Sequence, residues 1–263
     1  GNTYAYTINN PAYGIHNVKI YALDLVGKVS SLSDSFNVVD TTAPVFNPAL
    51  TDKTSELGQP FSYDVNADDL REVRYSIDDT TNFNIDSNGL ITNKTSLDLG
   101  NYLLTINASD LDNNNNIASI IISVVDTTAP VWNPSPANQV SEYGKLFSYD
   151  VNANDLQTIV YSVDDTINFN IDSDGLITNL SALSLGDYPL RITASDASGN
   201  NAITNINILV SDTIAPTFNP NPSNPPSEYG QPFSYPVNAD DLQAIIYTMN
   251  DIINFAIDSV TGI

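Results

Sequence analysis

Hydrophobic and polar residues alternate over several short stretches of the chain, and the clearest of these is residues 59–67. Phe61, Tyr63, Val65 and Ala67 fall on one face of an extended segment there, and polar side chains fall on the other. Alternation with a period of two residues is typical of a β-strand that buries one face. These residues therefore predict a half-buried strand.

The same pattern predicts the other strands of a small β domain. We expect short strands at residues 72–77, 82–85 and 90–93, a turn at 86–89, and two longer strands with the inward residues Tyr102, Leu104, Ile106 and Ala108, then Ile120, Ile122 and Val124. A further strand is expected before Glu56. About seven short strands separated by turns are typical of an immunoglobulin-like sandwich. No segment has a sustained helical period, so the predicted fold class is all-β.

The whole pattern recurs every 86 residues without slippage. Asp-Thr-Thr-Ala-Pro begins at Asp40 and at Asp126, and Asp-Thr-Ile-Ala-Pro begins at Asp212. A period of this length indicates a string of similar small domains. We predict the C-terminal part of a sandwich at 1–39, complete repeats at 40–125 and 126–211, and the N-terminal part of a repeat at 212–263.

Each of the two outer segments contains only some of the strands of a sandwich. The apolar residues that need a partner sheet are Val18, Ile20, Phe36 and Val38 in the first segment and Phe233, Tyr235 and Val237 in the last. Half a sandwich exposes apolar faces and unpaired edges and is not expected to be stable alone. We therefore expect head-to-tail pairing, either with neighbouring repeats of a longer chain or between separate copies of this chain.

Composition excludes several classes of partner. The formal net charge is −23, with only eight Lys and Arg residues, which repels nucleic acids and anionic lipids. The chain has no Cys, so disulfides and thiolate metal sites are excluded. No apolar run approaches the ~20 residues that cross a bilayer, so no direct membrane insertion is expected in this segment.

Four segments of the repeat resemble the cadherin repeat in order and spacing. They are Phe-Ser-Tyr-Asp-Val-Asn-Ala-Asp-Asp at 61–69, Val-Arg-Tyr-Ser-Ile at 73–77, Phe-Asn-Ile-Asp-Ser-Asn-Gly-Leu-Ile-Thr at 83–92 and Tyr-Leu-Leu-Thr-Ile-Asn-Ala-Ser-Asp at 102–110. The chain is more similar still to the cadherin-like repeats of prokaryotic, especially archaeal, cell-surface proteins, where such units alternate with Asp-Thr-Thr-Ala-Pro linkers. This resemblance implies tandem immunoglobulin-like (cadherin-like) seven-stranded β-sandwiches, here with incomplete sandwiches at both ends, in an extracellular protein.

The resemblance also implies candidate calcium ligands, because carboxylates at cadherin domain junctions bind calcium and stiffen the rod. The matching acids are Asp40, Asp126 and Asp212 in the linkers, Glu56, Glu142 and Glu228 near each repeat start, Asp69, Asp155 and Asp241 after the second strand, and Asp24, Asp110 and Asp196 in the Ala-x-Asp motif. The family's Asp-Arg-Glu motif is missing at 96–99 and at 182–185, which argues against a full three-ion junction. The alternative is that these Asp residues only form turns.

An enzyme site is not expected. His16 is the only histidine and occupies the position of Tyr102 and Tyr188, so we place it at the rim of a core. Every pair of Asp residues suitable for a glycosidase recurs in each repeat, whereas an active site is expected once. The acidic and amide-rich stretch at 112–116 is predicted to be a solvated hairpin loop.

The predicted function is that of a structural extracellular repeat protein that forms a stalk or filament on the cell surface. The alternative is an adhesin that binds a glycan or another cell through loops at the end of a sandwich; no repeat has the enlarged or aromatic loop that would favour it. Asn93, Asn107 and Asn179 lie in Asn-x-Ser/Thr sequences, which predicts glycosylation. Apart from calcium, no cofactor is expected.

Overall fold

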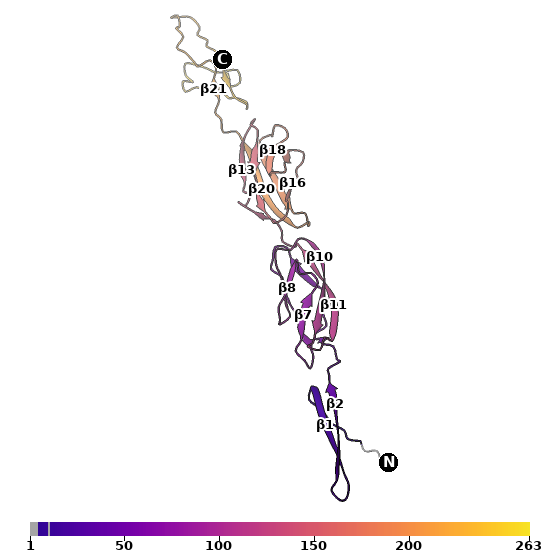
Figure 1. Cartoon of the computed structure of the whole chain (residues 1–263). Coiled ribbons are helices and arrows are strands. Elements are labelled where there is room, and N and C mark those ends of the chain that lie inside the picture. The colour runs from indigo at the N-terminus through magenta and orange to yellow at the C-terminus, as the bar shows by residue number, and fades with distance from the viewer. Residues whose placement is uncertain (1–4, 10) are drawn as a thin grey trace. The chain divides into compact units, whose positions relative to one another are not determined.

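A computed structural model describes residues 5–9 and 11–263, so residues 1–4 and 10 of the predicted first segment lie outside the described residues. Contacts divide the chain into two compact units, Gly1–Asp126 and Thr127–Ile263 (Figure 1). This division lies one residue from the predicted border between the two complete repeats, and all the predicted borders stay predictions. The described residues form β-strands and no helix, which confirms the all-β fold class.

The first unit begins with a β-hairpin. Its strands are β1 (Gly14–Leu23) and β2 (Val29–Val38), paired antiparallel with Gly14 opposite Val38. Of the residues expected to face inward, Val18, Phe36 and Val38 are half-buried, whereas Ile20 is 57% exposed and Leu32, opposite it in the ladder, is 65% exposed. The hairpin is therefore formed by its own ladder and turn rather than by a covering sheet.

The rest of the first unit is a sandwich of nine short strands. They are β3 (Val45–Phe46), β4 (Lys53–Glu56), β5 (Ser62–Asp64), β6 (Ala67–Asp68), β7 (Arg74–Ile77), β8 (Phe83–Ile85), β9 (Leu90–Asn93), β10 (Gly100–Ser109) and β11 (Asn115–Val125). One sheet has the order β4-β11-β10-β7 and the other β5-β9-β8, and β3 pairs with β6 in a short separate ladder. The predicted count of about seven strands is not confirmed.

The extra strands arise because the strand predicted at 59–67 changes partners in its middle. The Val65 N–H donates to the Gly89 carbonyl at 3.0 Å, and the next carbonyl, of Asn66, accepts from the Asn47 N–H at 2.9 Å. The chain thus leaves the ladder with β9 and joins the ladder with β3. An unbroken alternation in the sequence therefore corresponds to two short strands.

The core lies between the two sheets, on the faces that the alternation predicts. Phe61 and Val65 point inward from one side, and Leu104 and Ile106 point inward from the other; all are at most 6% exposed. The ring of Phe83 makes an edge-on contact with Tyr102, with centroids 5.9 Å apart. The two long strands β10 and β11 therefore cover the aromatic side chains of the smaller sheet.

The second unit repeats this sandwich with every strand shifted by 86 residues. Its strands are β12 (Val131–Trp132), β13 (Gln139–Glu142), β14 (Ser148–Asp150), β15 (Ala153–Asn154), β16 (Val160–Val163), β17 (Phe169–Ile171), β18 (Leu176–Asn179), β19 (Gly186–Ser195) and β20 (Asn201–Ser211). The sheet orders β13-β20-β19-β16 and β14-β18-β17 match those of the first sandwich. The sequence period is therefore also the period of the structure.

Residues 212–263 contain only one short ladder, between β21 (Thr217–Phe218) and β22 (Ala239–Asp240). Their aromatic side chains are open: Phe233 is 45% and Phe255 is 51% exposed. The matching Phe147 and Phe169 of the second sandwich are 6% and 1% exposed. The same residue types are therefore buried only where a long hairpin covers them.

Candidate metal centre

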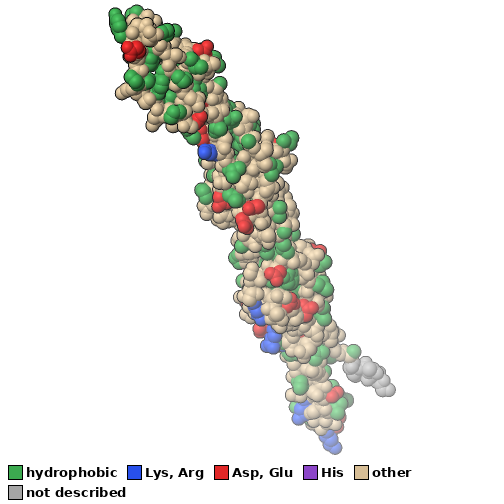
Figure 2. Space-filling model, turned by 90° about the horizontal axis from the view of Figure 1, so that it is seen from above, with side chains coloured by type: hydrophobic (Ala, Val, Ile, Leu, Met, Phe, Trp, Pro, Cys, Tyr) green, Lys and Arg blue, Asp and Glu red, His purple; other side chains and the backbone are tan. Residues whose placement is uncertain are grey.

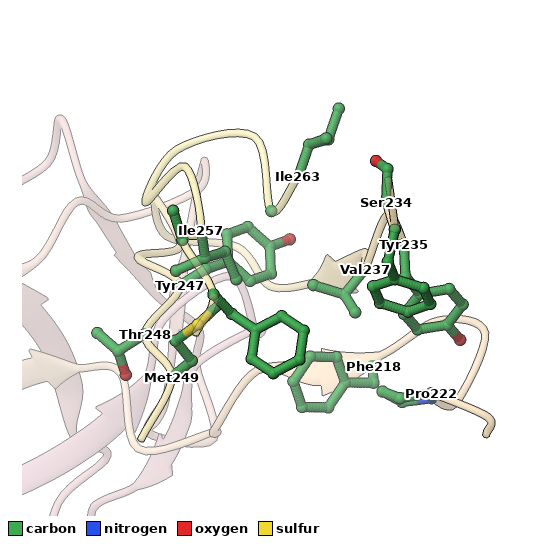
Figure 3. A pocket seen from close by; sticks show the side chains of 14 residues that line it. Phe218, Pro222, Ser234, Tyr235, Val237, Tyr247, Thr248, Met249, Ile257 and Ile263 are labelled. Atoms are coloured by element: carbon green, nitrogen blue, oxygen red, sulfur yellow. The ribbon is translucent and has the colours of Figure 1, made fainter. Parts of the chain in front are cut away.

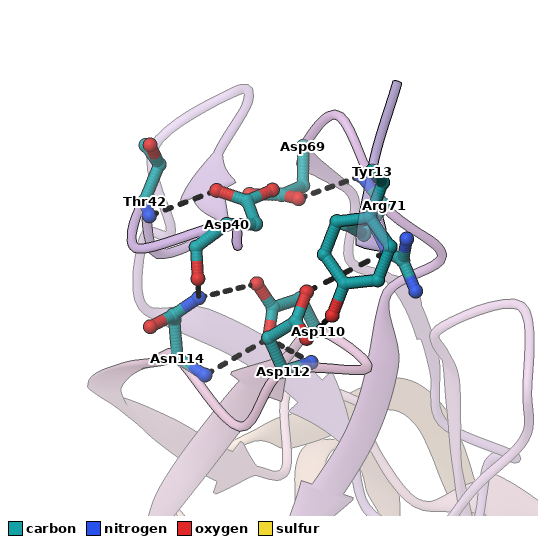
Figure 4. Close-up of polar contacts among 8 residues, drawn as sticks. All are labelled: Tyr13, Asp40, Thr42, Asp69, Arg71, Asp110, Asp112 and Asn114. Atoms are coloured by element: carbon teal, nitrogen blue, oxygen red, sulfur yellow. Dashed lines mark hydrogen bonds and ion pairs between the residues drawn. The ribbon is translucent and has the colours of Figure 1, made fainter. Parts of the chain in front are cut away.

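The best candidate for a metal centre lies where the Asp-Thr-Thr-Ala-Pro linker meets the β10–β11 loop (Figure 4). The Asp40 Oδ1 accepts a hydrogen bond from the Thr42 N–H at 2.9 Å, which closes an Asx turn at the start of the linker. The Asn114 Nδ2 donates to the Asp40 carbonyl at 3.1 Å and to the Asp110 Oδ2 at 2.7 Å. The side-chain amide of Asn114 thus joins the linker to the β10–β11 loop.

Asp110 is the buried member of this group, with 3% of its surface exposed. Its Oδ1 accepts hydrogen bonds from the N–H groups of Asp112 at 2.9 Å and Asn114 at 2.8 Å. Burial acts to raise the pKa of Asp110, but the hydrogen bonds from Asn114 and Asp112 outweigh it, and the pKa lies below its ordinary value. Asp110 is therefore ionised at neutral pH.

The structure brings the predicted Asp40 and Asp110 together and adds Asp112, which was predicted to be a solvated loop residue. One carboxylate oxygen of each of the three residues lies within 4.8 Å of the others. Calcium takes six to eight oxygen ligands, several of them carboxylates. The residue types fit calcium, although Asp110 already accepts three hydrogen bonds from the loop.

A positive charge lies beside the same carboxylates. The Arg71 Nε is 3.7 Å from the Asp112 Oδ2, and the Tyr13 hydroxyl donates to the Asp112 Oδ1. The Arg71 guanidinium also lies over the Tyr13 ring, 4.0 Å from its centroid. The hydrogen bond to Asp112 raises the pKa of the Tyr13 hydroxyl above its ordinary value. Arg71 therefore offsets part of the negative charge of the group.

The second unit contains Asp155 and Asp196, the counterparts of Asp69 and Asp110, with a carboxylate oxygen of each within 4.8 Å of the other. Asp196 is 6% exposed and accepts from the Asn200 Nδ2 and the Asn200 N–H, both at 2.8 Å. Asp155 accepts from the Gln157 N–H at 2.7 Å. The counterpart of Asp40 in the linker, Asp126, is the last residue of the first unit.

Several other predicted ligands are engaged in local turns, as the alternative interpretation expects. In four of them the carboxylate accepts a hydrogen bond from the backbone N–H two residues later: Asp24 at 3.0 Å, Asp69 at 2.7 Å, Asp212 at 3.2 Å and Asp241 at 2.7 Å. Glu56 ends β4, and Glu228 is exposed. Whether any of them also binds a metal stays a prediction.

Glu142 holds the linker that follows its own sandwich. Its two carboxylate oxygens accept from the Thr213 N–H at 3.0 Å and from the Thr213 hydroxyl at 2.6 Å. These bonds, the hydroxyl first, lower the pKa of Glu142 below its ordinary value. The acid near the start of the repeat therefore fastens the Asp-Thr-Ile-Ala-Pro segment even with no metal involved.

The remaining candidates occupy structural positions. The His16 ring stacks on Phe36 with centroids 5.1 Å apart, as expected for a rim residue. In each of two predicted glycosylation sites the side-chain oxygen accepts from a backbone N–H at 2.8 Å: Asn93 from Phe61, and Asn179 from Phe147. The third, Asn107, donates to the Ser76 hydroxyl at 3.5 Å. Glycosylation stays a prediction at all three.

Sequence reasoning missed Asp112 and Arg71 because it searched for acids that recur in every repeat. Ser198 and Gln157 occupy the matching positions of the second repeat, so neither residue recurs. Positions 71 and 112 both differ from their counterparts in the second repeat, and the residues found there, Arg71 and Asp112, carry opposite charges. This joint difference was the signal available in the sequence.

No protein-family model and no curated protein match the chain. Human protocadherin-24 EC1-2 is similar in structure with 20% identity over 66% of this chain and 100% of the other, at a TM-score of 0.35. Drosophila N-cadherin EC1-4 is 20% identical over 76% of this chain and 59% of the other, at a TM-score of 0.35. The titin domains z1z2 in complex with telethonin are 16% identical over 67% of this chain and 100% of the other, at a TM-score of 0.43. These neighbours are cadherin-like and immunoglobulin-like adhesion or structural domains and not enzymes. The described residues include no helix long and apolar enough to cross a membrane.

Proposed function

We propose that this chain is a structural extracellular repeat protein that forms a stalk or filament on the cell surface and has no enzymatic activity. The observation that carries this proposal is the identity of the two complete sandwiches, which share strand bounds, sheet order and core positions at a constant offset of 86 residues. A spacer needs equal rigid units, whereas a catalyst needs one distinct site.

The surface supports the same role. On the face drawn in Figure 2, acidic side chains lie in small separate groups between uncharged and apolar surface. With a net charge of −23, copies of such a surface repel one another except where a specific contact is made. This repulsion favours the role of a spacer over that of a protein that associates nonspecifically.

Immunogold electron microscopy of the source cells with an antibody to residues 40–211 tests the proposal. Label along stalks or filaments outside the cell is expected, and label confined to the interior contradicts it. Binding of the purified chain to a glycan array would instead favour the adhesin alternative.

We further propose that Asp40, Asp110 and Asp112 hold a calcium ion that stiffens this junction, since they place three carboxylates within 4.8 Å. Calcium at millimolar concentration is expected to raise the melting temperature of the full chain, because it binds the folded state only. Asp40→Ala with Asp112→Ala should abolish most of that rise. Asp64→Ala, an exposed acid on β5, is the matched control and should preserve it.

Titration calorimetry provides the independent measurement. If no heat appears at millimolar calcium, the calcium proposal is wrong, and these acids are turn formers whose charge Arg71 offsets.

The partner in a filament is proposed to be a second copy, bound through the open face of residues 212–263. Phe218, Val237, Tyr247 and Phe255 line a cavity of about 350 Å³ on that face (Figure 3). In the complete sandwiches the matching face is covered by the long hairpins, where Phe83 contacts Tyr102 and Phe169 contacts Tyr188, each pair 5.9 Å apart. The face therefore has the form that accepts such a hairpin.

The hairpin β1–β2 has the required register. Gly14 lies opposite Val38, as Gly100 lies opposite Val124 and Gly186 opposite Val210. We propose that β1–β2 of one copy covers residues 212–263 of the next, a head-to-tail contact that propagates as a fibre. The two complete sandwiches are the templates for this contact.

One residue of the hairpin opposes this contact and makes it testable. Asp34 occupies the position of Ile120 and Ile206, which are 1% and 4% exposed. Burying a carboxylate there is costly, so self-association of residues 1–263 is expected to be weak. Asp34→Ile should lower the dissociation constant at least tenfold in analytical ultracentrifugation. Ser33→Ile, on the other face of β2, is the control and should leave it unchanged.

If Asp34→Ile and Ser33→Ile change the dissociation constant equally, this binding mode is wrong. Phe255→Asp should prevent association even in the Asp34→Ile background, because it places a charge inside the acceptor face. If it does not, a surface other than 212–263 joins the copies.

A further inference from the structure

The contact among Tyr13, Arg71 and Asp112 joins three separate segments of the first unit. Tyr13 directly precedes β1, Arg71 lies between β6 and β7, and Asp112 lies in the β10–β11 loop. Figure 4 shows the Tyr13 ring lying between the Arg71 side chain and the acidic loop. The contact therefore connects the N-terminal hairpin to the end of the sandwich that follows it.

Each side chain of this group makes two contacts within it. The Tyr13 hydroxyl donates to Asp112, and its ring lies under the Arg71 guanidinium at 4.0 Å. The Arg71 Nε is also 3.7 Å from the Asp112 Oδ2. An exposed ion pair or a cation–π contact alone is weak, but a closed triangle restricts all three side chains together. A planar guanidinium suits this arrangement because it can stack and pair at the same time.

The positions 86 residues later carry a different set. They are Leu99 in repeat 40–125, and Gln157 and Ser198 in repeat 126–211. Within the second unit the Gln157 Nε2 donates to the Ser198 hydroxyl at 2.6 Å, so the two loop positions again contact each other, but without charge. The aromatic ring, the cation and the anion are thus all present at positions 13, 71 and 112 and all absent 86 residues later.

We propose that Tyr13, Arg71 and Asp112 form a clasp that holds the N-terminal hairpin against the end of repeat 40–125. The loops of this repeat hold a phenol ring that lies just before the first strand of the hairpin. Gln157 and Ser198 have no charge with which to hold such a ring. The clasp thereby limits bending between the hairpin and the sandwich without a metal ion.

This inference does not depend on the proposed calcium site. A bound calcium ion would compete with Arg71 for Asp112, whereas the clasp holds the junction when calcium is removed. Measurements in the presence of a chelator therefore separate the two proposals.

The experiment uses the full chain, which has no natural cysteine. Ser31→Cys on the exposed part of β2 and Ser96→Cys on the sandwich accept one spin label each. Pulsed electron paramagnetic resonance then gives the distribution of distances between hairpin and sandwich. In chelator, a single narrow distribution is expected for the otherwise natural chain.

Three substitutions that introduce the residues found 86 positions later test the clasp. Tyr13→Leu, Arg71→Gln and Asp112→Ser should each broaden the distribution at least twofold, and Tyr13→Phe should broaden it by removing the donor alone. Arg74→Gln, at an exposed arginine on β7, is the control and should leave the width unchanged. Melting of each variant checks that the sandwich still folds.

Two results would overturn the clasp. In the first, all four variants keep the natural width. In the second, the distribution is already broad in chelator and becomes narrow only with calcium, which would show that the metal and not the triangle holds the junction.

Discussion

Truncating Phe169 to alanine is expected to lower the free energy of unfolding of the second sandwich by about 3–5 kcal/mol, the usual cost of removing a large buried ring. Phe169 is 1% exposed and makes edge-on contacts with Phe147 and Tyr188, both with centroids 5.9 Å apart. Removing the ring leaves a cavity bounded by both sheets.

Trp132 gives a direct measurement of this effect, because it is the only tryptophan and lies in the second sandwich, stacked on Tyr161. Its fluorescence during denaturant unfolding reports on residues 126–211. The matched control is Phe255→Ala, at the corresponding position of the last segment, where the ring is 51% exposed. That variant should change the Trp132 transition by less than about 0.5 kcal/mol. Equal effects of the two variants would mean that Phe169 is not a core residue.

The comparison of Phe169 with Phe255 also shows what the sequence can predict about the fold. Alternation correctly predicted which residues face inward, because it depends only on the two-residue period of a strand. It could not predict which inward faces are covered. Residues 212–263 repeat the pattern of the first strands, yet Phe233 is 45% exposed because no hairpin lies over it.

The break in the strand at 59–67 was beyond sequence reasoning for a similar reason. Whether the Asn66 carbonyl pairs with Asn47 or continues the ladder to β9 depends on contacts between residues about 20 apart. The local alternation is the same in both cases. Strand counts therefore differ from the prediction although the faces agree.

The candidate metal centre was predicted in part. Asp40 and Asp110 were found because their motifs recur, and the structure places them together. Asp112 and Arg71 were missed because they occur in one repeat only, and recurrence was the criterion for importance. Repetition identifies the scaffold well, but it hides residues that distinguish one junction from another.

The second large effect is expected at Gly175, whose backbone approaches a neighbouring strand too closely for any side chain. Its φ is +92°, a region that non-glycine residues rarely adopt, and an added Cβ would lie 2.0 Å from the Val151 carbonyl oxygen. The Val151 N–H donates to the Gly175 carbonyl at 3.1 Å, so separating the two residues also breaks a ladder bond. Gly89 and Val65 make the same contact in the first sandwich.

Gly175→Ala is therefore expected to destabilise the second sandwich by at least about 3 kcal/mol, from the left-handed backbone and the forced movement together. Gly199→Ala separates the two causes, because Gly199 has nearly the same φ, +90°, but no atom within 4 Å of the added Cβ. It should cost only about 1–2 kcal/mol. Both residues belong to the repeat that contains Trp132, so one fluorescence measurement compares them. If the two variants lose equal stability, close approach to Val151 is not what requires glycine at position 175, and the backbone conformation alone explains it.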